Sequence, residues 1–334
     1  MATNDFQTFA AGGGANVLTQ AQYLALTSIL ANGFSAGVAP SAQLNKVWRQ
    51  SSIMSTVLAQ FIVNTTGQNA TDDGTTATLL ANLTAAISAN SEALIGSARN
   101  LVMSVTAASA TATMTADEIV VGSALGGLKY SLASFSKTIN LATTGAGGMD
   151  TGSAPVSGYV ALYAIYNPTT GTAALLAQNA STLRTNVYSG ANMPAGYTAS
   201  ALVGVWPTNA SGQFPVGYQL DRTVCTSSIT VLNSGTVQGS PTSLSISSAV
   251  PANARTVSGN TQVSNTAATN VSMSVFPTNT SVGGQGITAL VAATGSLSAV
   301  FRSLPIATAQ TIYYTSFSSS GTPTFNISIS GYDF

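Results

Sequence analysis

Charged side chains are scarce in this sequence. Asp, Glu, Lys and Arg make up 5% of its 334 residues, and the nine basic and nine acidic side chains cancel. An ordinary soluble domain carries about a quarter charged residues, and a free monomer with so little charge is poorly protected against association. Without a basic patch to neutralise phosphates, we expect no nucleic-acid partner. The scarcity of charge therefore predicts large contacts between chains.

Histidine is absent, and cysteine occurs once, at Cys225. A single cysteine forms no disulfide within the chain, and in a strand-like run we expect it to be a small buried side chain. Nucleophilic catalysis lacks its usual base, and Ser136-Lys137, the candidate for a serine–lysine pair, has no visible partner. Only carboxylate and carbonyl oxygens remain to bind Ca²⁺ or Mg²⁺, and the DxDxDG calcium loop is missing. We expect no cofactor and no metal site, although an ion on a symmetry axis stays open.

Carboxylates are too scattered to suggest an enzyme. Glycoside hydrolysis needs an acid and a base or nucleophile on two sides of one bond. Asp72-Asp73-Gly74 is better explained as a turn before a helix, where negative charge suits the helix dipole. Asp117-Glu118 lies in a strand-like run, where neighbours point to opposite faces. Asp150, Asp221 and Asp333 stand alone, so the sequence predicts no catalytic residue.

Long apolar runs are also missing. No run approaches the ~20 residues that cross a bilayer, and the opening MATNDFQTF lacks the basic and apolar regions of a secretory signal. We therefore expect synthesis in a cytosol and no membrane insertion. Ala, Ser, Thr, Gly and Asn take the place of the charges, and 45% of the residues are apolar. This mixture favours packed structure, because disordered chains combine low hydrophobicity with high charge.

The sequence begins with signals for a flexible segment and then a helix. Residues 1–15 end in FAAGGGA and are predicted to be flexible. Thr19-Gln-Ala-Gln22 has the form of a capping box, with apolar residues following at helical spacing. Asn32-Gly33 is expected to end this helix.

A longer helix is predicted between Ser41, as its cap, and Gly67, where it ends. Its apolar face would consist of Leu44, Val47, Trp48, Met54, Leu58, Phe61 and Ile62. Trp48 and Trp206 are expected to be core residues.

A third helix is predicted from about Thr75. In this helix, apolar residues recur seven apart, at Leu80, Ile87, Leu94 and Leu101. Two interpretations stay open: a three-helix bundle within one chain, and a small helical assembly around a symmetry axis. Both place a helical domain at residues 16–97.

From Ala98 the apolar period changes to two, which is typical of strands. The runs Tyr159–Tyr166, Ser200–Trp206 and Phe214–Leu220 are rich in β-forming residues and bounded by Gly, Pro or Asn. They predict a β-sandwich of jelly-roll type over residues 98–228.

A second β-sandwich is predicted at residues 229–334, where strands recur every ten to fifteen residues. The fold class expected is therefore α+β and multidomain, with a helical adaptor before two mainly antiparallel β-sandwich domains. Near the end, Tyr313, Tyr314 and Phe317 are candidates for stacking on sugar rings. By alternation, one of the two tyrosines is expected to face the core.

Several segments resemble tail-fibre and related virion proteins of tailed bacteriophages. In the helical part these are NVLTQAQYLAL, GFSAGVAPSAQLNKVWRQSSIMSTVLAQFI and DDGTTATLLANLTAAI; in the β part they are INLATTGAGGMDTGSAPVSGYVALYAIYNPTTG and GANMPAGYTASALVGVWPTNASGQF. The resemblance implies a homotrimeric fibre located on the virion and made in the host cytoplasm. It also implies an N-terminal region attached to a neighbouring virion protein, and a C-terminal region toward a bacterial surface glycan or outer-membrane protein.

The resemblance leaves the position on the virion open. Such modules occur in tails and in heads, so a head-bound decoration fibre or spacer without a receptor role is the alternative. A polysaccharide-degrading tailspike is a weaker one, because it needs convergent carboxylates. We expect the apolar face of the long helix to carry the attachment and Tyr313, Tyr314 and Phe317 to be receptor contacts.

Overall fold

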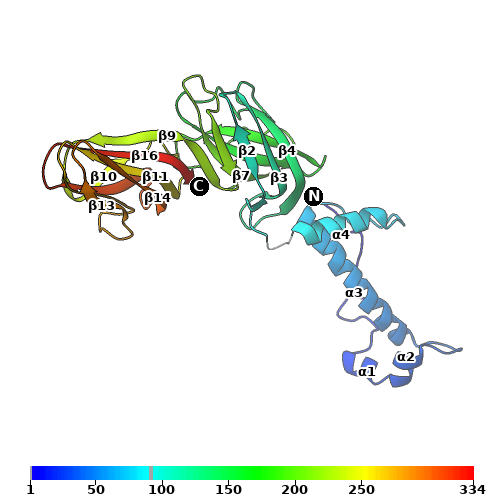
Figure 1. Cartoon of the computed structure of the whole chain (residues 1–334). Helices are drawn as coiled ribbons and strands as arrows, with labels where there is room; N and C mark the ends of the chain where they lie inside the picture. Colours follow the sequence, from blue (N-terminus) through cyan, green and yellow to red (C-terminus); the bar gives the residue numbers. More distant parts are fainter. Residues whose placement is uncertain (1, 90–92) are drawn as a thin grey trace. The chain divides into compact units, whose positions relative to one another are not determined.

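The computed structural model describes residues 2–89 and 93–334. It is mostly antiparallel β-sheet, with 43% strand and 15% helix. The chain divides into two compact units: Met1–Glu92 with Gly127–Lys129, and Ala93–Gly126 with Tyr130–Phe334. The first contains the helices and is called the helical unit; the second contains the sheets and is called the β unit (Figure 1). The expected β-rich α+β class is confirmed in this coarse form.

The helical unit begins with two short helices, α1 (Gln20–Leu24) and α2 (Thr27–Asn32), where the sequence predicted one. The capping box at Thr19 is present, since its hydroxyl accepts a hydrogen bond from the Gln22 amide and the Gln22 side chain binds back. Gly33 ends α2 with a φ of 79°, a left-handed value that glycine adopts without strain.

The long helix α3 spans Ser41–Thr66 and ends at Gly67, which has a φ of 69°. Its start differs in detail from the prediction. Pro40 occupies the N-cap position and Ser41 is the first helical residue, so no side chain caps this end. Helix α4 (Ala77–Ala89) follows and packs against α3.

The β unit contains two antiparallel sheets. The larger has twelve strands, with the path β14-β11-β16-β9-β8-β2-β3-β7-β5-β6 and with β1 and β4 also paired to β3. The smaller has the order β10-β15-β12-β13. The strands span β1 Ala98–Arg99, β2 Val102–Val105, β3 Thr111–Gly122, β4 Lys129–Asn140, β5 Tyr159–Asn167, β6 Thr172–Asn179, β7 Ala199–Pro207, β8 Gly217–Leu220, β9 Thr223–Ser234, β10 Gln238–Ser245, β11 Thr256–Asn265, β12 Thr269–Phe276, β13 Gln285–Val291, β14 Ser296–Pro305, β15 Thr311–Ser318 and β16 Pro323–Asp333.

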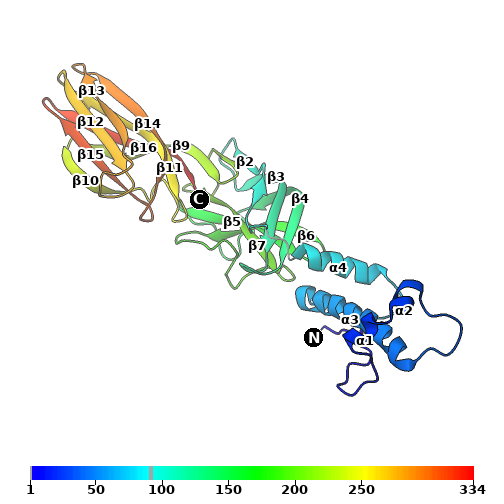
Figure 2. The ribbon, with the colours of Figure 1, turned by 90° about the horizontal axis from the view of Figure 1, so that it is seen from below.

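The C-terminal strands form two facing layers (Figure 2). In β11 and β15, every second residue is buried, as expected for strands with one face toward a core. The buried faces of β11 and β16 contribute Val263 and Ile327, and those of β12 and β15 contribute Met273 and Ile312, to one hydrophobic cluster. This is the sandwich-like arrangement that the alternation predicted.

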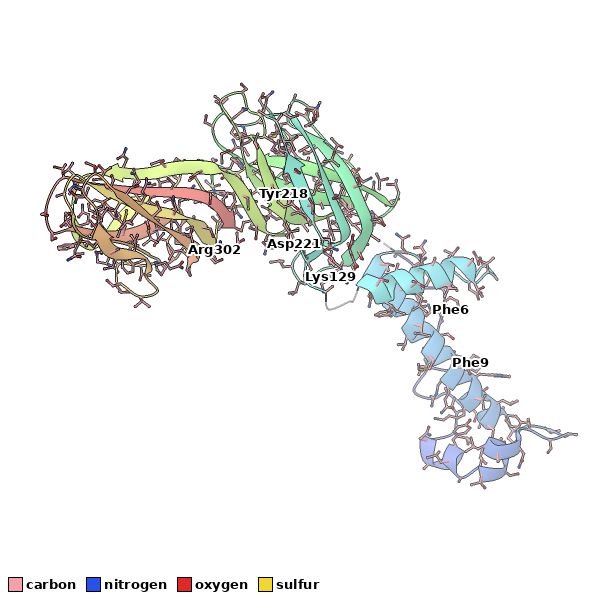
Figure 3. All side chains as sticks on the ribbon, in the orientation of Figure 1. Phe6, Phe9, Lys129, Tyr218, Asp221 and Arg302 are labelled. Atoms are coloured by element: carbon pink, nitrogen blue, oxygen red, sulfur yellow. The ribbon has the colours of Figure 1, made fainter. Side chains whose placement is uncertain are left out.

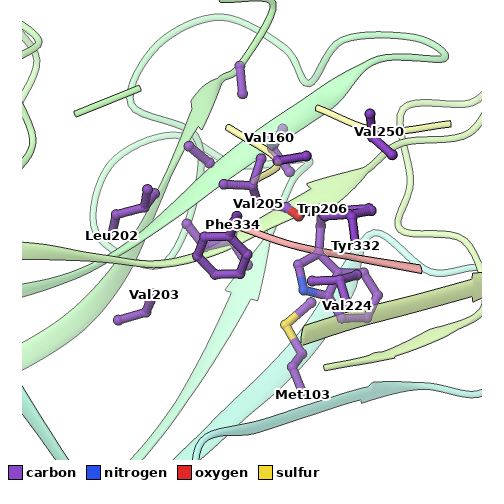
Figure 4. Close-up of a cluster of buried hydrophobic side chains, with 14 of the residues drawn as sticks. Met103, Val160, Leu202, Val203, Val205, Trp206, Val224, Val250, Tyr332 and Phe334 are labelled. Atoms are coloured by element: carbon purple, nitrogen blue, oxygen red, sulfur yellow. Dashed lines mark hydrogen bonds between the residues drawn. The ribbon is translucent and has the colours of Figure 1, made fainter. Parts of the chain in front are cut away.

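The expected boundary between residues 228 and 229 falls inside one strand. Strand β9 pairs with β8 at its start and with β16 along most of its length. The last residues of the chain also enter the core of the preceding region: the Tyr332 hydroxyl donates to the Val205 carbonyl over 2.6 Å, and Phe334 is buried beside it (Figure 4). The two β-regions therefore share a sheet and a hydrophobic core.

A buried amide joins β8 to β7 and to the turn that follows β8 in this core. Gln219 is fully buried and accepts a 2.6 Å hydrogen bond from the indole nitrogen of Trp206. Its Nε2 donates to the carbonyls of Val203 and Asp221, each over 2.7 Å. A buried polar group is tolerated when its hydrogen bonds are made, and here both ends of the amide are bonded.

The first prediction concerns this amide. Gln219→Leu keeps the side-chain size but leaves the Trp206 N–H and two carbonyls without their partner, so the free energy of unfolding should fall by about 2–4 kcal/mol. Urea unfolding measures it. The matched control is Gln213→Leu, at a half-buried side chain whose Oε1 accepts one long 3.5 Å bond from Asn209; it should cost less than about 1 kcal/mol. Equal losses would contradict this account.

A second prediction concerns alkaline pH. Tyr163 is fully buried, its hydroxyl donates to the Thr185 carbonyl over 2.9 Å, and burial raises its pKa to about 12. An unfolded tyrosine ionises near pH 10, so between these values the unfolded chain loses a proton that the folded chain keeps. The free energy of unfolding must then fall as pH rises.

Tyr163→Phe should remove about 2–3 kcal/mol of the loss between pH 10 and 12. Unfolding of both proteins at pH 7 and across this window measures it, and the pH 7 comparison separates the lost hydrogen bond from the titration. An alkaline slope that is identical in the two proteins would refute the assignment.

Candidate functional site

An N-terminal segment lies along α3 in the helical unit. Asn4 forms a β-bridge with Ala70 and donates from Nδ2 to the Thr56 carbonyl over 3.3 Å. The Phe9 amide donates to the Ser52 hydroxyl, and the Phe9 ring meets Trp48 edge-on at 5.7 Å. Residues 3–9 are therefore held against the helix (Figure 3) rather than flexible as predicted, because asparagine and aromatic side chains give this stretch partners on α3.

An apolar groove opens between this segment, α3 and α4. It encloses about 290 Å³ and is lined by Phe6, Leu58, Ile62, Leu80 and Leu83, among others. Ile62 is buried at its base, whereas Leu58 and Leu80 are about half or more exposed. The groove thus has a buried apolar base and two apolar edges that are exposed to solvent.

The predicted attachment face of α3 is divided by the packing. Leu44, Val47 and Phe61 are half-buried, whereas Trp48, Met54 and Leu58 are exposed. Val57, which sequence reasoning missed, is 56% exposed next to Met54 and Leu58; positions 54, 57 and 58 follow helical i, i+3, i+4 spacing, and this spacing was a usable signal. On α4, Leu80 and Ile87 are 65% and 61% exposed.

We call Met54, Val57, Leu58, Leu80 and Ile87 the apolar helix surface. Residues 50–89 carry charge only at Asp72 and Asp73, in the turn before α4. Because Leu80 and Ile87 are exposed, these two members of the heptad-like row do not pack into a helical bundle within the chain. Leu101 leaves the row altogether, because it is buried in the β unit.

The C-terminal aromatics share one strand, β15. Tyr314 is buried, as expected for one member of the pair, while Tyr313 is half-buried and Phe317 is 47% exposed. Tyr313 and Phe317 lie four residues apart and so point to the same outer face of the sheet. They remain available as contacts, and Tyr314 does not.

The carboxylates have separate local partners. Asp117 accepts a 2.6 Å bond from Asn100, and Glu118 accepts one from Ser131. Asp150 accepts bonds from the Tyr188 hydroxyl and the Gln178 amide at 2.9 and 3.1 Å. Hydrogen bonds from the Thr75 side chain and backbone lower the pKa of Asp73. Within the described residues, no three Asp, Glu, His or Cys side chains gather as a metal site would require.

The expectation that Cys225 is a small buried side chain is wrong. Cys225 is exposed rather than buried, because its place in β9 puts it on the solvent face while Val224 enters the core. A single strand with one buried face assigns alternate residues to opposite sides, and the sequence near Cys225 is too polar on both sides to show which side is buried.

Comparison with known proteins leaves the chain without an assigned family. No family model matches it, and a search of curated proteins found no match. Among the residues that the structure describes, no helix is both long and apolar enough to cross a membrane.

Proposed function

We propose that this chain is a structural protein of a bacteriophage virion, a fibre that attaches through its helical unit and contacts the host surface through its β unit. The resemblance of its segments to tail-fibre proteins supports the assignment. The observation that carries it is the apolar helix surface beside the groove between α3 and α4. Contiguous exposed apolar surface of this kind marks contact with another protein.

Attachment through this surface follows from the cost of leaving it in water. Met54, Leu58 and Leu80 offer apolar side chains on both edges of a groove that accepts a partner's side chain. An amphipathic segment or ring of a virion protein can bury them, as in helix-and-groove recognition. A tail location is proposed, and a head location would use the same surface.

Self-association belongs to the same proposal. The chain has no net charge, which leaves little repulsion between copies, and we propose a homotrimer. Size-exclusion chromatography with light scattering tests this directly, since a stable monomer at micromolar concentration would contradict it.

The third prediction separates the two ends. A fragment of residues 93–334 retains the β unit, including Gly96, whose carbonyl accepts a bond from Arg222. It should fold, compete with phage for host cells and fail to enter virions. Competition measured by plaque reduction, with fragment incorporation measured by immunoblot of purified particles, checks both. Incorporation of the fragment, with cell binding by residues 1–92 alone, would reverse the proposed polarity.

A point variant refines this test. Leu58→Ser with Leu80→Ser places two hydroxyls on the edges of the groove and should reduce incorporation of the full chain into virions while leaving cell binding intact. Val38→Ser is the matched control, because Val38 is 98% exposed in the loop between α2 and α3, away from the apolar helix surface. Gold labelling of incorporated protein then distinguishes head from tail.

A further inference from the structure

One row of residues crosses the solvent face of the larger sheet. In the register of the strands, Tyr218 of β8 is opposite Cys225 of β9, Cys225 is opposite Gly331 of β16, and Gly331 is opposite Ser258 of β11. Directly opposed residues of antiparallel strands point to the same face. Tyr218 and Cys225 are exposed, so this face is the outer one.

Irregularities in three neighbouring strand pairs coincide at this row. The register shifts between Ile329 and Gly331 where β16 meets β9, between Ser258 and Gly259 where β11 meets β16, and between Val257 and Gly259 where β11 meets β14. Bulges bend strands and re-aim side chains, and they are frequent next to functional sites.

The aligned bulges surround a hollow of about 340 Å³. Gly331 forms part of its floor: a Cβ there would lie 2.9 Å from the Val224 carbonyl oxygen, so the backbones approach closely and no side chain fills the space. On the β14 side, the Ser303 amide donates to the Ser258 hydroxyl over 3.0 Å. This bond holds the wall of the hollow in place.

Charge collects at this hollow in a region that has almost none. Residues 229–334 contain three charged side chains, at Arg255, Arg302 and Asp333, and the last two line the hollow. Both carboxylate oxygens of Asp333 already accept hydrogen bonds, from Thr223 and Thr256.

Arg302 is different. Its backbone is fixed by two bonds with the Gln285 side chain, at 2.9 and 3.0 Å, while its side chain is exposed. Within the described residues, no hydrogen bond or ion pair engages its guanidinium. A cation positioned by its backbone and unengaged at its tip is available to a ligand.

We propose that this face binds a glycan that carries carboxylate groups, with a sugar ring against Tyr218, the chain across the Gly331 hollow, and a carboxylate at Arg302 (Figure 3). The inference rests on the proposed host contact and specifies its ligand. Tyr218 and Arg302 lie four strand spacings apart, about 19 Å, which suits an extended chain rather than one ring.

The chemistry of the row matches such a ligand at each point. An aromatic face packs against the apolar face of a sugar, and hydroxyls such as those of Ser258 and Thr223 exchange hydrogen bonds with sugar hydroxyls. A guanidinium binds a carboxylate through two parallel bonds. The Asp333 carboxylate repels an anion at its own end, so the ligand's carboxylate is directed to Arg302.

The position of Cys225, the only cysteine, provides a direct test on the full chain. A hexamer of galacturonic acid should slow alkylation of Cys225 by N-ethylmaleimide, and protein alkylated beforehand should no longer bind the hexamer in calorimetry. Cys225→Ser should bind the hexamer whether or not it has been treated with the reagent. Failure of Cys225 to react in the free protein would overturn the proposal, because the face would then be covered.

Variants at the charged end give the second readout. Arg302→Gln should weaken binding of the hexamer by about tenfold or more, as expected for loss of a charge-assisted pair. Arg255→Gln, at an exposed arginine that does not line the hollow, is the matched control and should bind normally. Equal binding of neutral maltohexaose, or of hexaglutamate, would overturn the assignment to an acidic glycan.

The outcome is separable from the proposed function. If the hexamer and related oligouronates give no protection of Cys225 at about 10 mM, a concentration that detects even millimolar affinity, this site assignment is wrong. The fibre function would still stand if fragment 93–334 competes with phage. If neither occurs, both proposals fail.

Discussion

The β unit depends on where its last strand lies. Strand β16 sits between β9 and β11 rather than at an edge, so the final residues complete a sheet that earlier strands begin. Tyr332 then reaches the Val205 carbonyl, and Phe334 stacks near the Arg222 guanidinium, 5.3 Å from its ring centre. These contacts join residues more than a hundred positions apart. The β unit therefore cannot finish folding until the residues up to Phe334 are present, and its two β-regions are stabilised together rather than one after the other.

The sequence predicted the local elements better than their connections. Helix α3 and its end at Gly67 follow from helical spacing and from glycine's tolerance of positive φ. Alternation predicted that one of Tyr313 and Tyr314 faces the core, without saying which, and Tyr314 is the buried one. The expected domain boundary between residues 228 and 229 does not separate two domains, because it lies inside β9. Turn residues indicate where a strand ends locally and carry no information on which strands pair. Strand β9 passes through that point without interruption, since its partners β8 and β16 come from both sides of it.

The candidate sites show the same limit. Helical spacing indicated Met54 and Leu58 as surface-forming residues, but it does not show which apolar residues stay exposed. Trp48, which was expected in the core, is 52% exposed although the Phe9 ring meets it edge-on. The row from Tyr218 to Arg302 was beyond reach of the sequence, because its members lie on five strands and only the register brings them level. Beside Gly331 the register shifts by one residue between β11 and β16 and by two residues between β16 and β9, and no residue pattern near Gly331 predicts these shifts.

Because charged residues are scarce in this chain, each exposed charge that remains is informative about function. In a chain with many ionic groups, an exposed arginine is an ordinary part of a solvated surface. Here solubility and pairing rest on serine, threonine and asparagine, so Arg302 is not needed to balance a neighbouring carboxylate, and the carboxylate of Asp333 is met by two threonine hydroxyls. Neutral hydroxyls satisfy hydrogen bonds without adding charge. A surface built this way keeps nonspecific electrostatic attraction weak. In the proposed site, one cation whose backbone is fixed beside a glycine-floored hollow then discriminates between ligands instead of binding every anion.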